Sequence, residues 1–231
     1  MSLLKIKNLE KSYKEAGGIL KDVSLNIEKG EVVVILGPSG CGKSTLLRCI
    51  NGLESIQGGE ILLDDEVISN RKNDMHLIRQ KIGMVFQSPC LFEHLKVIDN
   101  ATFALDCKGF PKKQRHEIGQ TWLERFGISE LETRYPVNLS GGEAQRVSLV
   151  RTLIAEPKIV LFDEPFSALD TPLRKKLTDD LKTWQKELGF TAILVTHDIE
   201  EAKKLGDKII VLKSGQITWE GLPEEFEEEL L

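Results

Sequence analysis

The sequence predicts an α/β fold with a mostly parallel β-sheet. Short, continuously apolar runs recur along the chain, as expected for strands that are covered on both faces of a sheet. Stretches with helical periodicity lie between these runs, and a glycine-rich segment joins the first run to the first helical stretch. Buried strands that alternate with helices are typical of α/β proteins. The apolar runs cover residues 32–36, 159–162, 192–195 and 209–212.

The N-terminal residues predict strands of a different kind. Apolar and charged residues are interspersed over 4–9, and apolar and polar residues alternate strictly over 23–27. Such alternation is typical of a half-buried strand with one face toward solvent. We therefore expect an N-terminal antiparallel β subdomain beside the parallel core.

Helical periodicity marks the segments between the apolar runs. The clearest stretches are 43–51, 142–155 and 173–188, and two more cover 97–108 and 112–126. The region from about 88 to 157 contains no buried strand, so we expect an α-helical subdomain inserted into one domain of residues 1–231. The segment 224–231 carries five glutamates and predicts a frayed helical end.

The composition excludes several classes of protein. Of 231 residues, 41% are hydrophobic and 29% are charged, which is ordinary for a globular domain. The net charge of −5 argues against nucleic acid as a partner. The apolar runs are far shorter than the roughly 18 residues needed to span a bilayer, and no signal peptide pattern opens the chain. The cysteines show no zinc spacing, so we expect free thiols at Cys41, Cys49, Cys90 and Cys107.

The glycine-rich segment after the first apolar run matches the phosphate-loop pattern G-x-x-x-x-G-K-[ST]. Its glycines let the backbone curl so that several N–H groups face one anion, and the following helix adds its positive end. Lys43 supplies a charge for the β- and γ-phosphates, and the Ser44 hydroxyl is a Mg²⁺ ligand. The pattern predicts a nucleoside triphosphate site made of Gly37, Pro38, Ser39, Gly40, Cys41, Gly42, Lys43, Ser44 and Thr45.

Two carboxylates end the apolar run at 159–162. Successive strand residues point to opposite faces, so Asp163 and Glu164 are expected to do different work. Beside a phosphate loop, Asp163 would hold Mg²⁺ and Glu164 would deprotonate the attacking water.

A second anion site is predicted where the helical stretch near residue 142 begins. A serine and two glycines at a helix N-terminus can bind an anion without a lysine. The motif reads Leu139, Ser140, Gly141, Gly142 and Glu143. With this motif, the sequence resembles the ATP-binding cassette (ABC) ATPase family, of which LSGGE is the signature.

Four further residues match the family's motifs in order along the whole chain. Gln87 corresponds to the Q-loop glutamine, which contacts Mg²⁺, and Asp170 to the D-loop. His197 corresponds to the switch histidine, and Tyr13 to the aromatic residue that stacks on adenine.

The resemblance implies a head-to-tail homodimer that binds ATP and Mg²⁺. ATP on the phosphate loop of one copy would be covered by Ser140 and Gly142 of the other copy. Lys43, Glu164, Gln87 and His197 would carry catalysis, and Asp170 would communicate across the dimer.

Within the family, the resemblance is greatest to the motor subunits of transporters. The segment between Gln87 and Leu139 is too short for the inserted coiled coil of DNA-repair members. A motor subunit implies membrane permease partners, a solute-binding protein and a place on the cytoplasmic face of the membrane. An alternative is a cassette that drives cell division or lipoprotein release.

Different segments of the chain point to different transported solutes. Segments 47–51 and 78–87 look like cassettes of polar amino-acid importers, whereas 171–174 looks more like those of sugar or anion importers. The short segment after Glu220 leads us to expect no C-terminal regulatory domain.

Cys41 and the region after Gln87 carry two further expectations. Cys41 lies beside a helix N-terminus and near Lys43, which predicts a reactive thiolate unless the loop buries the sulfur. The region after Gln87 predicts a groove for a permease helix, near Leu91, Phe92 and Leu95, although a core role for Phe92 is an open alternative.

Overall fold

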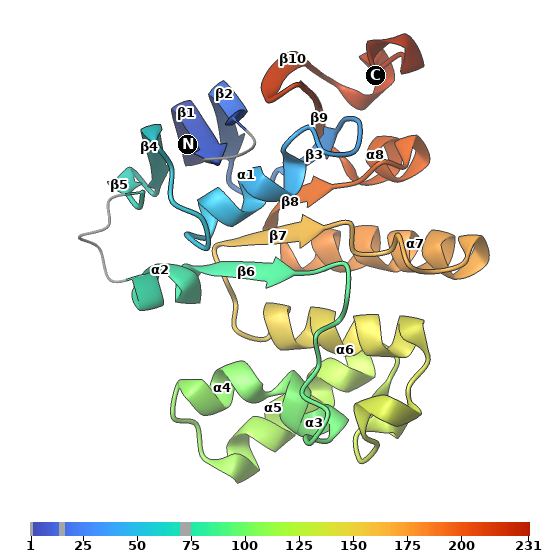
Figure 1. The fold of residues 1–231 in the computed structure, drawn as a ribbon. Helices are drawn as coiled ribbons and strands as arrows, with labels where there is room; N and C mark the ends of the chain where they lie inside the picture. Colours follow the sequence, from blue (N-terminus) through green and yellow to red (C-terminus); the bar gives the residue numbers. More distant parts are fainter. Residues whose placement is uncertain (1, 14–16, 70–74) are drawn as a thin grey trace.

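The computed structural model describes residues 2–13, 17–69 and 75–231, and its centre is a six-stranded sheet (Figure 1). The strand order is β10-β9-β3-β8-β7-β6, and all neighbours except β10 and β9 are parallel. The strands are β3 (Val32–Leu36), β6 (Ile82–Val85), β7 (Ile159–Asp163), β8 (Thr191–Val195), β9 (Lys208–Lys213) and β10 (Gln216–Gly221). All four apolar runs are strands, which confirms the predicted α/β class.

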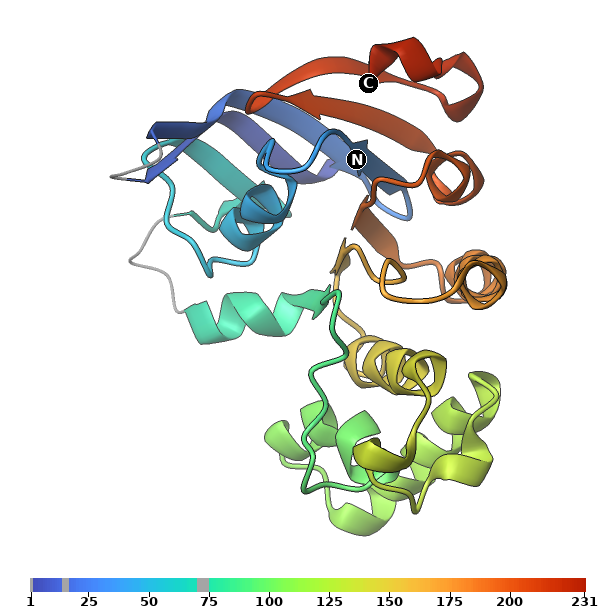
Figure 2. The same ribbon diagram turned by 45° about the vertical axis from the view of Figure 1, so that its right-hand side comes forward.

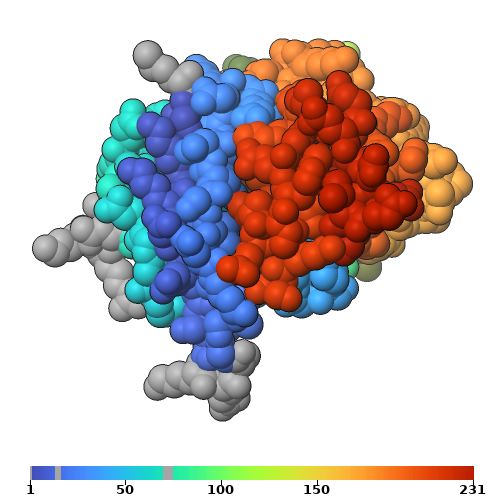
Figure 3. Space-filling view, turned by 90° about the horizontal axis from the view of Figure 1, so that it is seen from above, coloured from blue at the N-terminus to red at the C-terminus, as the bar shows by residue number. Residues whose placement is uncertain are grey.

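The N-terminal strands form a second, antiparallel sheet with the order β2-β1-β4-β5. Its members are β1 (Ser2–Tyr13), β2 (Gly17–Glu28), β4 (Gly58–Leu63) and β5 (Glu66–Val67). The two sheets meet where Lys21 N donates to Gly215 O at 2.8 Å, and Figure 3 shows the N-terminal and C-terminal strands side by side there.

The parallel sheet divides the interior into two hydrophobic cores. Along β3, Val32, Val34 and Leu36 face one core while Val33 and Ile35 face the other. The first core contains residues of helices α3, α5, α6, α7 and α8, and the second contains residues of α1, α2 and the antiparallel sheet. The central strands are therefore buried on both faces, which explains their continuous apolar runs.

Most helices lie beside or below the parallel sheet (Figures 1 and 2). Those outside the segment between β6 and β7 are α1 (Lys43–Ile50), α2 (Met75–Lys81), α7 (Thr171–Leu188) and α8 (Ile199–Leu205). Those within it are α3 (Val97–Ala101), α4 (Phe103–Cys107), α5 (Lys112–Arg125), η1 (Ser129–Leu131), η2 (Pro136–Asn138) and α6 (Gly141–Leu153). Figure 2 shows this group below the sheet, joined to it by the chain after β6 and by the chain before β7.

Two predicted helices differ from the structure. The stretch 97–108 is two helices, because it breaks at Thr102, whose buried hydroxyl donates to Ile98 O at 2.7 Å. The C-terminal segment is two 3₁₀ turns, η3 (Pro223–Glu225) and η4 (Glu228–Leu230). Phe226 between them is 2% exposed and packs edge-on against Trp219, so this end of the chain is anchored to β10.

Among the residues that the structure describes, no helix has both the length and the apolar character that crossing a membrane requires.

Candidate functional site

The predicted chemical groups converge at the carboxyl ends of the parallel strands. The phosphate loop follows β3, the two carboxylates end β7, His197 follows β8 and Gln87 follows β6. Asp163 is in register with Val195, which in turn is in register with Ile35. Ligands of open α/β sheets bind at this edge.

The phosphate loop curls around the ammonium group of Lys43. Its Nζ donates to Gly37 O at 2.7 Å and to Pro38 O at 3.1 Å, and the side chain is 6% exposed. The exposed rim of the loop is formed by Pro38, Ser39 and Gly40, while Cys41 lies in its buried floor.

Two glycines of the loop combine a positive φ with a close neighbour. At Gly37, with φ 155°, a Cβ would lie 2.1 Å from Leu212 O of β9. At Gly42, with φ 110°, it would lie 2.8 Å from Leu20 Cδ2 of β2. Gly42 also caps α1, so the loop delivers the chain into this helix with its N–H groups toward the site, beginning with Lys43, Ser44 and Thr45.

The donor set for a magnesium ion fits the predicted residues. Ser44 Oγ donates to Asp163 Oδ1 at 2.7 Å, which pairs a hydroxyl with a carboxylate that is 8% exposed. No cluster of three or more His, Cys, Asp or Glu side chains suited to a metal occurs in the described parts of the chain. A single carboxylate with further oxygen ligands is the arrangement that Mg²⁺ uses beside substrate phosphates.

Glu164 and His197 form a second pair at the same edge. Glu164 Oε2 lies 3.3 Å from His197 Nδ1, and both side chains are partly exposed. Glu164 has a left-handed backbone with φ 46°, a conformation that costs a non-glycine residue about 1–3 kcal/mol. Its N–H donates to Val195 O at 3.0 Å, which holds this turn against β8. The pair can act as a base with an orienting partner.

Gln87 is exposed beyond the end of β6. Its neighbour Phe86 is anchored by Gln145, a residue that was not predicted from the sequence. Gln145 of α6 is 2% exposed, and its Nε2 donates to Phe86 O at 3.3 Å. This bond joins the chain before Gln87 to the helix that begins within the signature motif. No sequence signal distinguishes Gln145 beyond its place in that helix.

Arg174 of α7 is a second residue that sequence reasoning missed. Its guanidinium donates to Ser167 O at 3.3 Å, to Leu169 O at 3.1 Å and to Asp198 Oδ2 at 3.4 Å. It therefore ties the segment after Glu164 to the segment after His197.

The signature motif caps its own helix. Ser140 is the N-cap of α6 and forms a capping box with Glu143, whose Oε2 accepts from Ser140 N at 2.7 Å and from Ser140 Oγ at 2.8 Å. These hydrogen bonds, the backbone one first, hold the pKa of Glu143 below its usual range. Leu139, just before the cap, packs against the hydrophobic core.

The signature glycines are also packing positions. A Cβ on Gly142 would lie 2.7 Å from Leu173 Cδ2, and one on Gly141 would lie 3.2 Å from Leu169 Cδ2. The start of α6 therefore fits closely against the segment that contains Asp170. Asp170 itself is the N-cap of α7 and accepts from Leu173 N at 3.0 Å.

The structure does not bring the signature motif to the phosphate loop. Residues of α1 pack in the core on one face of the parallel sheet, and residues of α6 pack in the core on the other face. Tyr13 is closer to the loop in the fold: it pairs with Gly17 at the start of β2, and Ile19 and Leu20 of β2 contact Gly42.

The surroundings of Cys41 match the alternative in which the loop buries its sulfur. Its side chain is buried, and burial raises the pKa of the thiol despite the opposing effect of Lys43. Desolvation outweighs the nearby charge, so a thiolate is disfavoured.

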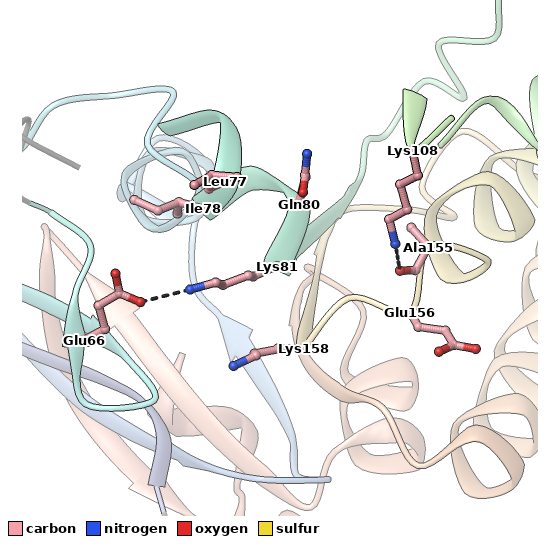
Figure 4. Close-up of a pocket in the computed structure, with 9 residues that line it drawn as sticks. All are labelled: Glu66, Leu77, Ile78, Gln80, Lys81, Lys108, Ala155, Glu156 and Lys158. Atoms are coloured by element: carbon pink, nitrogen blue, oxygen red, sulfur yellow. Dashed lines mark hydrogen bonds and ion pairs between the residues drawn. The ribbon is translucent and has the colours of Figure 1, made fainter. Parts of the chain in front are cut away.

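A pocket of about 430 Å³ lies at the opposite edge of the sheet. Lys81 and Lys158 precede β6 and β7, so the pocket is at the amino ends of these strands (Figure 4). Lys81 is paired with Glu66, and Lys108 donates to Ala155 O. These lysines are therefore already engaged, and the pocket is separate from the phosphate loop.

A family model described as ABC transporter matches residues 20–167, which include the phosphate loop, the signature motif and both strand-end carboxylates. The chain belongs to the ABC transporter family. It is an ABC-type ATPase that binds ATP.

Named relatives of this ABC protein differ in their solutes. The glutamine transport ATP-binding protein GlnQ of Bacillus subtilis is 44% identical over 97% of this chain and 92% of its own length. The spermidine/putrescine import ATP-binding protein PotA of Clostridium novyi is 42% identical over 97% of this chain and 63% of its own. The sulfate/thiosulfate import ATP-binding protein CysA of Neisseria meningitidis is 44% identical over 95% of this chain and 61% of its own length.

Two solved structures share the fold of this ABC protein. CbiO1 of Clostridium perfringens, described as part of the transporter complex CbiONQ, has a TM-score of 0.89 and 35% identity, and the match covers 97% of this chain and 90% of that one. The ATP-binding cassette MJ0796, a dimer bound to ADP and Pi after hydrolysis, has a TM-score of 0.85 and 36% identity. The match covers 96% of this chain and 100% of that one. These matches agree with the predicted ABC ATPase fold.

Proposed function

We propose that this ATPase is the motor subunit of an importer, and that it hydrolyses MgATP at the carboxyl edge of its parallel sheet. The observation that carries the proposal is the convergence there of the Lys43 loop, the Ser44–Asp163 pair and the Glu164–His197 pair. Together they supply an anion cradle, a metal ligand set and a base.

Each residue in this site has a chemical role in the proposal. Lys43 and the N–H groups of the loop bind the β- and γ-phosphates. Ser44 and Asp163, with Gln87, would hold Mg²⁺, which neutralises phosphate charge when bound. Glu164 accepts a proton from the attacking water, while His197 orients the Glu164 carboxylate and contacts the γ-phosphate.

The signature motif acts in trans in this proposal. Since α6 and α1 lie on opposite faces of the sheet, Ser140 and Gly142 would complete the ATP site of a second copy. The close packing of Gly141 and Gly142 on Leu169 and Leu173 would carry changes at that site to Asp170. The dimeric solved structure of MJ0796 supports a homodimer.

The test uses Glu164→Gln, which keeps the shape of the side chain but removes the base. Hydrolysis should fall by about 10²–10⁴-fold, whereas ATP binding should persist. Light scattering should then show a dimer with ATP that the parent forms only transiently, and adding Ser140→Arg should remove it. A monomeric Glu164→Gln at saturating ATP would contradict the homodimer. A dimer unaffected by Ser140→Arg would contradict the placement of the signature in trans.

A membrane permease is the proposed mechanical partner, on the cytoplasmic face of the membrane. A groove of about 300 Å³ lies along the first residues of the edge strand β6 and is lined by Met84, Phe103 and Arg151 among others, but not by the predicted Leu91, Phe92 and Leu95. Phe92 packs on Phe103 with ring centroids 4.5 Å apart. A permease helix in this groove would contact the strand that leads to Gln87 and the helices α4 and α6.

The proposed solute is a polar amino acid delivered by a solute-binding protein. The 44% identity to a glutamine transport protein supports it, and PotA and CysA, which match to a similar degree, name the competing solutes. Uptake of labelled glutamine, spermidine and sulfate should be compared in cells with and without the protein. Loss of glutamine uptake alone is expected, and loss of another solute would reassign the class.

A further inference from the structure

A buried lysine lies directly under the aromatic ring that ends β1. Lys11 is 4% exposed, and its Nζ lies 4.6 Å from the centroid of the Tyr13 ring. The two residues are two positions apart on one strand, which places both side chains on one face. Tyr13 is 36% exposed, so part of its ring remains accessible.

The ammonium group of Lys11 is held in place by two further partners. Its Nζ donates to Ser55 O at 2.7 Å and lies 2.9 Å from Glu54 Oε2. An ammonium group has three N–H donors, and the carbonyl, the carboxylate and the face of the ring account for all three. A charge this buried is costly without such pairing, so its position is well determined.

Glu54 also contacts Tyr13. The pKa of the Glu54 carboxyl is lowered first by the hydrogen bond from Lys11, and a hydrogen bond from the Tyr13 hydroxyl adds to the effect. The ring is thus held through one face by Lys11, whose ammonium is in turn held by Glu54.

The residues around Glu54 are tied to both β1 and the phosphate loop. Gln57 N donates to Glu10 O at 2.9 Å, and Ser12 N donates to Gln57 Oε1 at 2.9 Å. The same segment follows α1, the helix that begins at Lys43. Residues 54–57 therefore fix the aromatic ring relative to the phosphate loop.

We propose that Lys11, anchored by Glu54, is a positioning residue that fixes Tyr13 as the stacking surface for the base of ATP. The inference rests on the proposed nucleotide site and on the role of Tyr13 within it. Lys11 covers one face of the ring, so the base stacks on the other face. A ring that is already oriented loses less conformational freedom when ATP binds.

The test compares ATP with inorganic tripolyphosphate, which has the phosphates but no base. Both are titrated by calorimetry without magnesium, so that no turnover occurs. Tyr13→Ala should weaken ATP binding by about 5- to 100-fold, the range expected for one stacked base. Lys11→Met should weaken it by about 3- to 20-fold, as expected for a lost cation–π contact. Neither change should alter the affinity for tripolyphosphate.

The double variant decides whether Lys11 acts through Tyr13. Lys11→Met added to Tyr13→Ala should cause no further loss of ATP affinity. Glu54→Gln, which weakens the anchor, should act in the same direction as Lys11→Met. In Lys11→Met and Glu54→Gln, KM for ATP should rise while kcat is kept. The matched control is Lys7→Met, an exposed lysine on the same strand, which should change nothing.

Three results would overturn the inference. The first is an unchanged ATP affinity in Lys11→Met. The second is an equal loss of ATP and tripolyphosphate binding, because Lys11 would then only support the fold. The third is a loss in the double variant that equals the sum of the two single losses. A different result would overturn the role of Tyr13 itself, namely a Tyr13→Ala variant that keeps the parent's preference for ATP over tripolyphosphate. Failure of the Lys11 inference and failure of the proposed base contact can therefore be told apart.

Discussion

Lys43 combines a structural and a binding role within a few ångströms. Its ammonium bridges the Gly37 and Pro38 carbonyls inside the phosphate loop. Lys43→Ala should lower ATP affinity by at least about tenfold, since hydrogen bonds to charged groups contribute about 1.5–3 kcal/mol. Calorimetry measures the affinity, and circular dichroism should show an intact fold. Unchanged affinity in a folded variant would contradict the phosphate loop. Lys7→Ala on the exposed side of β1 serves as the control.

The four cysteines should separate into two classes by reactivity. Cys90 and Cys107 are exposed, whereas Cys41 and Cys49 are buried, and burial raises the pKa of Cys49 to about 11. Because the thiolate is the reactive form, the exposed pair should be alkylated first at pH 8. Mass spectrometry after brief labelling checks this order, with denatured protein as the control in which all four react. Early modification of Cys41 would favour the reactive thiolate that its sequence neighbours suggest.

At the scale of elements, the start of α6 is limited by its contact with α7. A Cβ on Gly142 would lie 2.7 Å from Leu173 Cδ2. Gly142→Ala should therefore lower the free energy of unfolding by about 1–3 kcal/mol, the range typical of overpacking. Urea unfolding measures the change.

A substitution at Leu173 and a control substitution at Gly18 test the same contact between α6 and α7. Leu173→Ala makes room, so the double variant should be more stable than the sum of the two single losses predicts. Gly18→Ala, where a Cβ would be 3.5 Å from the Lys21 side chain, should be nearly neutral. Additive losses at Gly142 and Leu173 would show that the two elements do not press on each other.

The elements also show how far the sequence determines the structure. The strands at 32–36 and 159–163 were predictable because burial on both faces requires unbroken apolar runs. The break at Thr102 was not, since it depends on a side chain bonding back to Ile98 and on the packing of Gly119 against both residues.

The residues of the candidate site also divide into those that the sequence predicts and those that it does not. Lys43, Ser44 and Asp163 belong to contiguous motifs whose residue types state their chemistry, and the fold brings them together. Gln145 and Arg174 act through contacts between distant segments, and Cys41 depends on how deeply the loop is buried. Such properties depend on tertiary packing, which motif spacing alone does not specify.

At the scale of the whole molecule, the phosphate loop depends on strands from the other end of the chain. β3, which leads into the loop, pairs only with β8 and β9 in the sheet, and Gly37 lies against Leu212 of β9. A chain that ends after Gly189 lacks both neighbours and should not bind ATP, as measured by calorimetry. A chain that ends after Phe226 retains every strand and should bind it. ATP binding by the shorter chain would show that the loop forms without its sheet.

This strand order has a consequence for biosynthesis. The ribosome makes β3 and the phosphate loop early, whereas their neighbours β8 and β9 emerge only after helix α7 has been made. Pairing between strands so far apart in the sequence is slow, because the intervening chain loses conformational entropy before any strand contact forms. The half-made protein therefore carries an apolar strand with two open edges, a hazard for aggregation that chaperones on the nascent chain would cover.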